Sequence, residues 1–511
     1  MQSMNLDLLR WCDLEGTELH STLWLFLANL THSDNVKYQN VNNNVNRELG
    51  MAGTEKYVAC SSLPVSVEEA FAYHDRPGAL NRLIPPWESV EIEHSDQSLV
   101  VGSRVVITTK VFGIPLRWVA EHTHYDPPNF FADTQLSGPF ASWDHRHEFK
   151  EVGRYTNLRD CIEYKLPMGA LGRFFGGGKA LGTIESMFAF RHRLTHDDLT
   201  LQADRPCEPM TVAISGSSGL VGGQLGSLLT LLGHQVRPIV RGSSGDDNPI
   251  AAWSGENEAA KLGDVDAVVH LAGKPIASAR WTDELKNEIL DSRVVKTRQL
   301  CESLSKLERK PKVLICASAT GIYGNRGDEQ LNEDSNLGND FLADVGRQWE
   351  AACQPAIDAG IRVVKARLGI VLSPKGGALE KMLLPAKFAG GSLGNGKQWW
   401  SWISLDDVVG GIYHAITDES ISGAVNFVSP EPITNKDFAK TLGRAIGRPA
   451  IFPAPAFVLR TAMGEMADAL LLSSSRVIPG RLQRAGYRFR FTDLESLLRY
   501  SLDRYGLASA E

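Results

Sequence analysis

A glycine-rich segment near the middle of the chain has the spacing needed to hold a pyrophosphate. Gly216, Gly219 and Gly222 follow directly after the apolar run 211–215 and precede a helical run over 220–232. In such a strand, loop and helix, the first glycine permits a tight turn, the second admits the pyrophosphate, and the third lets helix and strand pack closely. The helix N-terminus presents free N–H groups and a positive dipole to the phosphates. The residues expected to contact a dinucleotide here are Gly216, Ser218, Gly219, Leu220, Val221 and Gly222.

Residues after the next two apolar runs bear on the choice of dinucleotide. The run 235–240 ends in Arg241, where a site that prefers NAD usually carries an acidic residue for the ribose 2′-hydroxyl. A guanidinium there can pair with a 2′-phosphate, which favours NADP(H), although Arg241 can also be read as a solvated residue at a strand end. The following run leads into Leu271, Ala272 and Gly273, which we expect beneath the adenosine side of the cofactor, with Gly273 allowing backbone approach.

The chain around this loop alternates between short apolar runs and helical segments. The runs TVAIS, QVRPIV, DAVVHLAG, KVLICASA and IRVVKARL are mostly separated by helical stretches of about 10–25 residues. This alternation is typical of a parallel sheet covered by helices on both faces. We therefore expect an α/β, Rossmann-type doubly wound domain over residues 210–430. A small, mainly helical domain over 431–511 is expected to complete the substrate cleft.

The region before residue 210 has a different pattern. From 51 to 205, strands rich in β-branched and aromatic residues are separated by turn residues, which predicts an antiparallel β domain of the α+β type. A helix over about 181–194, after three consecutive glycines, is expected to close it. Residues 1–50 include an Asn-rich stretch without apolar periodicity, so this extension is expected to be unpacked and dispensable for stability.

Eight of the 13 histidines lie between residues 51 and 205, and four of them form two H-x-H pairs, His122 with His124 and His145 with His147. Alternate residues of a strand share a side, so each pair could chelate a metal ion. Histidines on strands more often line a polar cavity or face solvent, and no cluster of carboxylates flanks either pair. The sequence therefore predicts no metal site.

Composition excludes several classes of partner. A net charge of -7 and a pI near 6.0 argue against binding to nucleic acid. The seven cysteines are scattered without a C-x-x-C pair, so we expect neither a disulfide framework nor a zinc knuckle, and a reducing compartment. The apolar stretch 19–30 is too short to span a bilayer and follows acidic residues, so we expect no membrane span, no secretory signal and a cytoplasmic protein.

Several motifs occur in the order found in a known family. The segments GSSGLVG, HLAGKPI, RWTDELKNEILDSRVVKT, SATGIYG, DFLADVGRQWE, RLGIVL and GGSLGNGKQWWSWISLDDVV resemble the atypical extended short-chain dehydrogenase/reductases, also described as epimerase-family proteins. The resemblance covers residues from about 210 to 505, and the tail is similar to the family's C-terminal domain of unknown function. Residues 51–205, with GPFASWDHRHEF, are similar to START-like (SRPBCC, helix-grip) ligand-binding domains fused to some members.

The resemblance implies an NADP(H)-dependent oxidoreductase or epimerase that acts on a hydroxyl or carbonyl carbon of a small-molecule substrate, with a nucleotide sugar as one candidate. The family's class uses a Tyr with a Lys four residues later as acid/base, and none of the 11 tyrosines here has Lys at that spacing. The place where this pair would be expected, 340–350, offers Phe341, Ala343, Asp344 and Arg347 instead. Proton transfer therefore needs another group, or there is little catalysis.

The resemblance also places candidate side chains on the substrate side. Ser318 and Thr320 stand where the family's substrate-facing hydroxyls lie. Tyr323 could supply a phenol, which would titrate near its usual value of about 10 unless a cation lies close; packing beneath the loop is an equal alternative. Asp406 and Asp407 resemble a motif of the class, and we expect them to cap a helix that begins at residue 408.

Two functional hypotheses remain open. In the first, the protein is an enzyme that transfers hydride between NADP(H) and its substrate, as the candidate hydroxyls and substrate-loop motifs indicate. In the second, it is a non-catalytic NADP(H) sensor or carrier whose helix-grip domain holds a hydrophobic ligand, as the missing Tyr and Lys pair indicates. The first is preferred.

Overall fold

A computed structural model of the protein describes residues 48–49, 54–111, 114–240, 251–252, 262 and 264–503. The chain divides into two compact units: unit 1 is Met1–Asp75 with Ser89–Ala203, and unit 2 is Arg76–Glu88 with Asp204–Glu511. Each unit has its own sheet and its own buried core.

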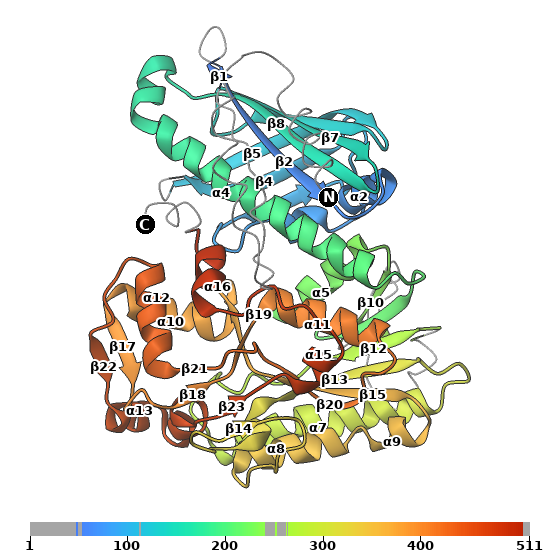
Figure 1. The fold of residues 1–511 in the computed structure, drawn as a ribbon, viewed down its shortest axis with the longest axis vertical. Helices are drawn as coiled ribbons and strands as arrows, with labels where there is room; N and C mark the ends of the chain where they lie inside the picture. The colour runs from blue at the N-terminus through green and yellow to red at the C-terminus, as the bar shows by residue number, and fades with distance from the viewer. Residues whose placement is uncertain are drawn as a thin grey trace, which may run out of the picture. The chain divides into compact units, whose positions relative to one another are not determined.

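Unit 1 is an antiparallel sheet with one long helix packed on it (Figure 1). The strand order is β1-β2-β8-β7-β6-β5-β4-β3. The elements are β1 (Glu48–Leu49), β2 (Glu55–Leu63), α2 (Val67–Asp75), β3 (Glu91–Ser95), β4 (Arg104–Val111), β5 (Ile114–Asp126), β6 (Phe130–Ser137), β7 (Ser142–Val152), β8 (Tyr155–Lys165) and α4 (Gly169–Asp204). Ile184 and Phe188 of α4 join Tyr57, Trp143 and Tyr164 of the sheet in one core. The expected antiparallel α+β domain is confirmed.

Two boundaries in unit 1 differ from expectation. Helix α4 begins at Gly169 and runs through the three glycines that were expected to precede it. Gly177 is buried, and a Cβ there would lie at ordinary contact distance, 3.8 Å, from Cδ1 of Leu166, the residue that follows β8. Packing here overrides low helix propensity. Within the extension expected to be unpacked, Glu48 and Leu49 pair with β2, and residues 1–47 lie outside the described residues.

Unit 2 contains a parallel sheet with strand order β11-β10-β9-β12-β13-β15-β20. The strands are β9 (Thr211–Ser215), β10 (Gln235–Val240), β11 (Ala251–Ala252), β12 (Ala267–His270), β13 (Val313–Ala319), β15 (Arg362–Leu368) and β20 (Gly423–Phe427). The order reverses between β9 and β12, and in open α/β sheets the carboxyl ends of the strands at such a reversal form the ligand site. The expected Rossmann-type sheet is confirmed.

Helices cover both faces of this sheet. Helices α5 (Leu220–Leu231) and α11 (Leu405–Thr417) contact each other on one face. On the opposite face, α7 (Asp283–Ser305) contacts both α8 (Phe341–Ala351) and α9 (Gln354–Asp358) (Figure 1). Leu300 and Leu304 of α7 pack with Val268 and Leu314 of the sheet in a buried cluster. Among the described residues, no helix combines the length and apolar character needed to cross a bilayer.

The rest of unit 2 consists of short elements beyond the main sheet. They are α3 (Ala79–Leu83), η2 (Thr320–Tyr323), β14 (Gln330–Leu331), β16 (Ile370–Ser373), α10 (Gly377–Lys387), β17 (Gly390–Leu393), β18 (Trp399–Trp400), β19 (Trp402–Ser404), β21 (Ile433–Thr434), α12 (Asn435–Ala445), β22 (Phe452–Ala454), α13 (Ala456–Met463), α14 (Glu465–Ala467), η3 (Asp468–Leu472), β23 (Arg476–Val477), α15 (Gly480–Arg484) and α16 (Leu494–Ser501). The pairing of β14 with β23 ties the C-terminal part to the loop after β13.

The segment Arg76–Glu88 belongs to unit 2 although it lies between strands of unit 1 in the sequence. Arg82 of α3 donates to Gln224 Oε1 of α5 over 2.8 Å and forms an ion pair with Asp406 at 2.9 Å. Its side chain is only 1% exposed, so this charge is neutralised in the interior.

The start of α11 corrects one expectation. The helix begins at Leu405, and its cap is Ser404, whose hydroxyl accepts from Asp407 N. Asp407 is fully buried and accepts from the main-chain N–H of Arg490 at 2.7 Å and of Phe491 at 3.2 Å. Burial raises the pKa of Asp407 to about 6, and the hydrogen bonds oppose that rise. Asp407 is therefore structural as expected, but it anchors the C-terminal segment, and the cap is Ser404.

We expect Asp407→Ala to destabilise unit 2 by about 3 kcal/mol, because it leaves several buried donors without an acceptor. Thr434 and Asp437 form the same cap arrangement at the start of α12, but that pair is exposed. Asp437→Ala is therefore the matched control and should cost less than about 1 kcal/mol. Urea unfolding followed by tryptophan fluorescence measures both, and equal losses would show that Asp407 acts only as a cap residue.

Candidate dinucleotide and substrate site

The glycine loop joins β9 to α5 at the reversal of strand order. Gly216 has φ 74°, a left-handed conformation that favours glycine. A Cβ at Gly216 would lie 3.0 Å from the main-chain nitrogen of Ala272. A Cβ at Gly222 would overlap the carbonyl oxygen of Gly216 and lie 2.9 Å from Ser217 Cα. Gly219 precedes the first helical residue and no side chain caps α5, so the N-terminus of the helix presents its N–H groups at the loop.

The second wall of this site follows β12. Leu271 N donates to the carbonyl oxygen of Ser215 over 3.1 Å, which keeps the two strand ends side by side. Gly273 lies under Arg293, because a Cβ there would be 3.4 Å from the guanidinium carbon. The structure thus brings together the loop residues and the second predicted group, Leu271, Ala272 and Gly273. Arg241 lies outside the described residues.

A buried chain of hydrogen bonds links the ends of β9 and β12. His270 Nδ1 lies 2.6 Å from Ser215 Oγ, and His270 Nε2 lies 3.0 Å from Thr297 Oγ1. Trp349 Nε1 donates to the same threonine oxygen over 3.0 Å. Burial lowers the pKa of His270 to about 4, with a smaller opposing effect from Cys353. A neutral imidazole, with one donor and one acceptor nitrogen, satisfies both neighbours.

Two of the three predicted catalytic side chains lie in the interior. Ser318 is 2% exposed and donates to Glu350 Oε1 over 2.9 Å. Tyr323 is 0% exposed and donates to Asn426 Oδ1 over 2.7 Å. Thr320, at the carboxyl end of β13, is partly exposed. The three residues are therefore close in sequence but differ in their access to a ligand.

A buried ion pair holds these side chains in place. Arg367 of β15 donates to Glu350 of α8 through Nε at 2.7 Å and Nη2 at 3.0 Å, and both side chains are at most 10% exposed. Nη1 of Arg367 donates to the phenol oxygen of Tyr323 over 2.9 Å. Burial alone would lower the pKa of Arg367, but Glu350 raises it above its usual value. Burial raises the pKa of Tyr323, and the nearby Arg367 only partly offsets this effect.

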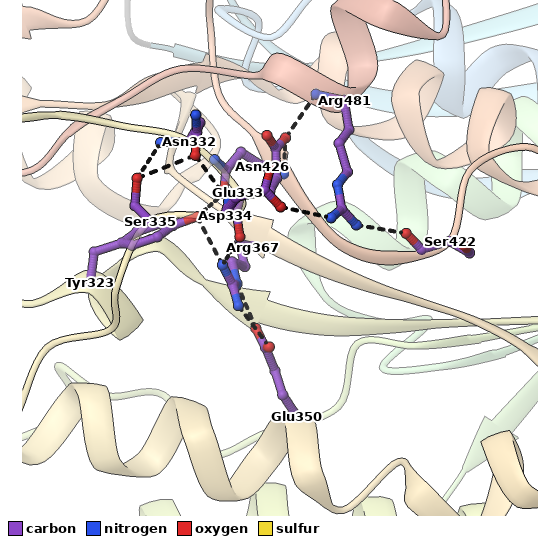
Figure 2. A network of polar contacts seen from close by, with 10 residues as sticks. All are labelled: Tyr323, Asn332, Glu333, Asp334, Ser335, Glu350, Arg367, Ser422, Asn426 and Arg481. Carbon is purple, nitrogen blue, oxygen red and sulfur yellow. Dashed lines mark hydrogen bonds and ion pairs between the residues drawn. The ribbon is translucent and has the colours of Figure 1, made fainter.

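The same network extends to the C-terminal part of unit 2 (Figure 2). Glu333 Oε1 accepts from the main-chain N–H of Asn426 at 3.1 Å and of Arg481 at 3.0 Å. The guanidinium of Arg481 donates to Asp334 Oδ1 over 3.1 Å and to the carbonyl oxygen of Ser422 over 3.0 Å. The end of β20 and the start of α15 are therefore fastened to the loop that follows Tyr323.

Comparison with known proteins agrees with this architecture. The model of the NAD dependent epimerase/dehydratase family matches residues 212–426, and a domain of unknown function (DUF1731) matches 454–500. The polyketide cyclase / dehydrase and lipid transport family matches 63–188. An epimerase family protein of Mycobacterium bovis is 42% identical over 299 residues, which are 58% of this chain and 98% of the relative. The chain belongs to the epimerase family.

Other relatives of this epimerase family protein include one from Bacillus subtilis, YfhF, 39% identical over 57% of this chain and 97% of the relative. A solved nucleoside-diphosphate sugar epimerase from Corynebacterium glutamicum is 32% identical, with a TM-score of 0.70, over 87% of this chain and 90% of that chain. The human epimerase family protein SDR39U1, solved with NADPH, is 32% identical, with a TM-score of 0.54, over 57% of this chain and 99% of that chain. The resemblance inferred from the sequence motifs is confirmed.

In this epimerase family protein, helix α8 occupies the place expected for the Tyr and Lys pair. Asp340 caps the helix through its side chain, which accepts from Ala343 N at 2.9 Å. Asp344 and Arg347 form an exposed ion pair at 3.2 Å. The inward residue of this helix that carries charge is Glu350, which holds Arg367.

Sequence reasoning missed Arg367, Glu350 and Glu333 as members of the site. A signal existed for Arg367, since an arginine inside the apolar run IRVVKARL must find a partner once the strand is buried in a sheet. The sequence did not predict which carboxylate would be this partner, because Glu350 lies 17 residues earlier in the chain, on helix α8 and not on the strand itself.

We expect His270 to make unit 2 sensitive to acid. Its pKa falls from about 6.5 in the unfolded chain to about 4 in the folded one, so its contribution is complete above pH 6.5 and declines as pH falls toward 4. Between pH 7 and pH 5 this loss amounts to about 2 kcal/mol.

His270→Gln keeps a donor and an acceptor but does not titrate in this range. We expect the difference in unfolding free energy between wild type and variant, measured in urea, to be about 2 kcal/mol smaller at pH 5 than at pH 7. A difference that stays constant with pH would show that His270 does not protonate on unfolding.

Proposed function

We propose that unit 2 binds NADP(H) and is an oxidoreductase or epimerase acting on a hydroxyl or carbonyl carbon of a small substrate, with nucleotide sugars as the first class to test. The observation that carries the proposal is the loop from Gly216 to Gly222, where two missing Cβ atoms leave the backbone open beside a helix N-terminus. This space suits a pyrophosphate, which takes main-chain N–H donors.

The residues that would hold the cofactor come from both sides of the strand reversal. Main-chain N–H groups of the loop would bind the pyrophosphate, with Ser218, Leu220 and Val221 at the start of α5. Leu271, Ala272 and Gly273 would lie beneath the adenosine. Arg241 would pair with a 2′-phosphate, and the NADPH in the human relative supports this preference. The bound cofactor would supply or accept a hydride.

On the substrate side, we assign different roles to the three hydroxyl residues. Thr320 is partly exposed at the carboxyl end of β13, where a substrate beside the cofactor would lie, so its hydroxyl would contact the substrate oxygen. Ser318 and Tyr323 would act as positioning residues through Glu350 and Arg367. The nucleoside-diphosphate sugar epimerase from Corynebacterium supports nucleotide sugars as substrates.

A second candidate function is an NADP(H) sensor whose unit 1 carries a hydrophobic ligand. It is favoured by the burial of Ser318 and Tyr323, which leaves only Thr320 of the predicted hydroxyls accessible, and by the missing Tyr and Lys pair. The match of residues 63–188 to a family that includes lipid transport proteins supports a hydrophobic ligand.

The cofactor site predicts a difference between two glycines of α5. Gly222→Ala should weaken NADPH binding at least tenfold, roughly 1.4 kcal/mol, because the new Cβ displaces the loop. Gly226→Ala is the matched control, since its Cβ would meet only Val236 Cγ1 at 3.9 Å. Arg241→Asp should weaken NADPH by roughly 10- to 100-fold and leave NADH much less affected. Fluorescence titration measures all three, and equal affinities in Gly222→Ala and wild type would place the cofactor elsewhere.

The enzyme proposal predicts that turnover of a nucleotide sugar depends on Thr320. Thr320→Val should lower kcat by about 10²- to 10⁴-fold and leave NADPH affinity unchanged, because positioned proton-transfer groups contribute that much. Thr320→Ser, which keeps the hydroxyl, should retain most of the activity. Wild-type protein that turns over no substrate of a broad panel, yet changes its small-angle scattering when NADPH binds, would favour the sensor instead.

A further inference from the structure

The inner face of the unit 1 sheet carries a row of polar side chains where a ligand-binding domain of this kind usually has apolar ones. His122 of β5 is paired in register with Asp133 of β6, and Asp133 is paired with His145 of β7. Residues directly opposite each other on antiparallel strands share a face. The row therefore places a carboxylate between two imidazoles.

A second row lies beside the first. His147 stands two residues after His145, so both side chains point to the same face, and His147 is paired in register with Asp160 of β8. Asp160 is 3% exposed, and its carboxylate contacts His147 and lies 3.2 Å from His145 Nε2. His192 of α4 approaches from the covering helix, with Nε2 2.5 Å from Asp160 and Nδ1 2.8 Å from Ser61 Oγ.

Three of these side chains converge on one point. Asp133, His145 and His147 each offer one ligand atom, and the three atoms lie within 4.8 Å of one another. The side chains are 18%, 5% and 13% exposed respectively, so the point where they converge is largely buried. We infer that unit 1 binds one divalent first-row transition metal ion through Asp133, His145 and His147.

The donor set decides the class of ion. Two imidazoles with one carboxylate are the ligands of zinc and of non-haem iron sites, whereas magnesium and calcium select oxygen donors. Three protein ligands leave further positions on the ion for water or another ligand. A carboxylate that contacts the ligating imidazoles orients them and raises their basicity, and Asp160 stands in that position.

Buried polar atoms near the set support a bound ion with its water. His122 Nδ1 and the phenol oxygen of Tyr57 are buried and lack a hydrogen-bond partner among the described residues. His122 is paired with Asp133 and therefore lies beside the proposed site, whereas Tyr57 lies two strands from His145, with Ile162 between them. Buried polar groups are normally satisfied, so the unpaired Nδ1 of His122 is the atom that a water on the bound ion would satisfy.

The test uses the full chain after dialysis against a chelator, with Co²⁺ as a spectroscopic probe and Zn²⁺ in calorimetry. We expect one equivalent of Co²⁺ to bind with a dissociation constant of about 10 µM or below, with visible d–d bands and a rise in melting temperature that a chelator reverses. Asp133→Asn and His147→Gln should each weaken binding at least tenfold, and Asp160→Asn should weaken it by about 10–100-fold.

His124→Gln is the matched control, because His124 lies exposed on β5, and it should bind Co²⁺ as wild type does. Absence of Co²⁺ binding in the wild type would overturn the proposal. Binding that survives in both Asp133→Asn and His147→Gln, with both variants folded by circular dichroism, would also overturn it. If His147→Gln does not fold, Asp133→Asn alone decides, since it keeps the shape of the side chain. NADPH affinity is expected to stay unchanged in every variant, so the outcome is independent of the function proposed for unit 2.

Discussion

An arginine buried within a parallel sheet needs a carboxylate beside it, and in unit 2 the pair of Arg367 and Glu350 meets this constraint. Removing one partner of such a pair typically costs about 3–5 kcal/mol, because an uncompensated charge remains in the interior. The pair has further consequences. Glu350 also accepts from Ser318, and Arg367 also donates to Tyr323, so the loop that follows β13 is set by the position of this charge pair.

Unit 1 also contains a buried carboxylate, but its partners are imidazoles instead of a guanidinium. Asp160 is surrounded by His145, His147 and His192, and it is almost completely buried. His270 of unit 2 has only neutral partners, so burial keeps it uncharged. Within the unit 1 cluster the histidines differ: burial lowers the pKa of His147 to about 4, whereas at His145 two carboxylates outweigh burial and raise the pKa to about 9.

Local sequence signals located most elements correctly and failed where packing decided the boundary. The apolar runs of unit 2 became adjacent parallel strands, because a short β-branched run between helices has few other ways to bury both faces. The glycines before residue 181 did not end a helix, because the long helix α4 packs on the sheet through Ile184 and Phe188 and this packing outweighs the low helix propensity of glycine. Helix α11 starts three residues earlier than expected, because the hydroxyl of Ser404 caps the first turn by accepting a hydrogen bond from the main-chain N–H of Asp407.

The sequence by itself determined the family, the two kinds of sheet and the dinucleotide loop, because each depends on residues that are near neighbours in the chain. It did not determine which polar groups meet. Tyr323 and Asn426 are 103 residues apart, and the carboxylates that contact His145 and His147 are not their sequence neighbours Asp144 and Glu148. Only strand pairing brought Asp133 and Asp160 to His145 and His147, and only the buried sheet forced Arg367 onto Glu350. Such contacts follow from register and burial, which the tertiary structure alone decides.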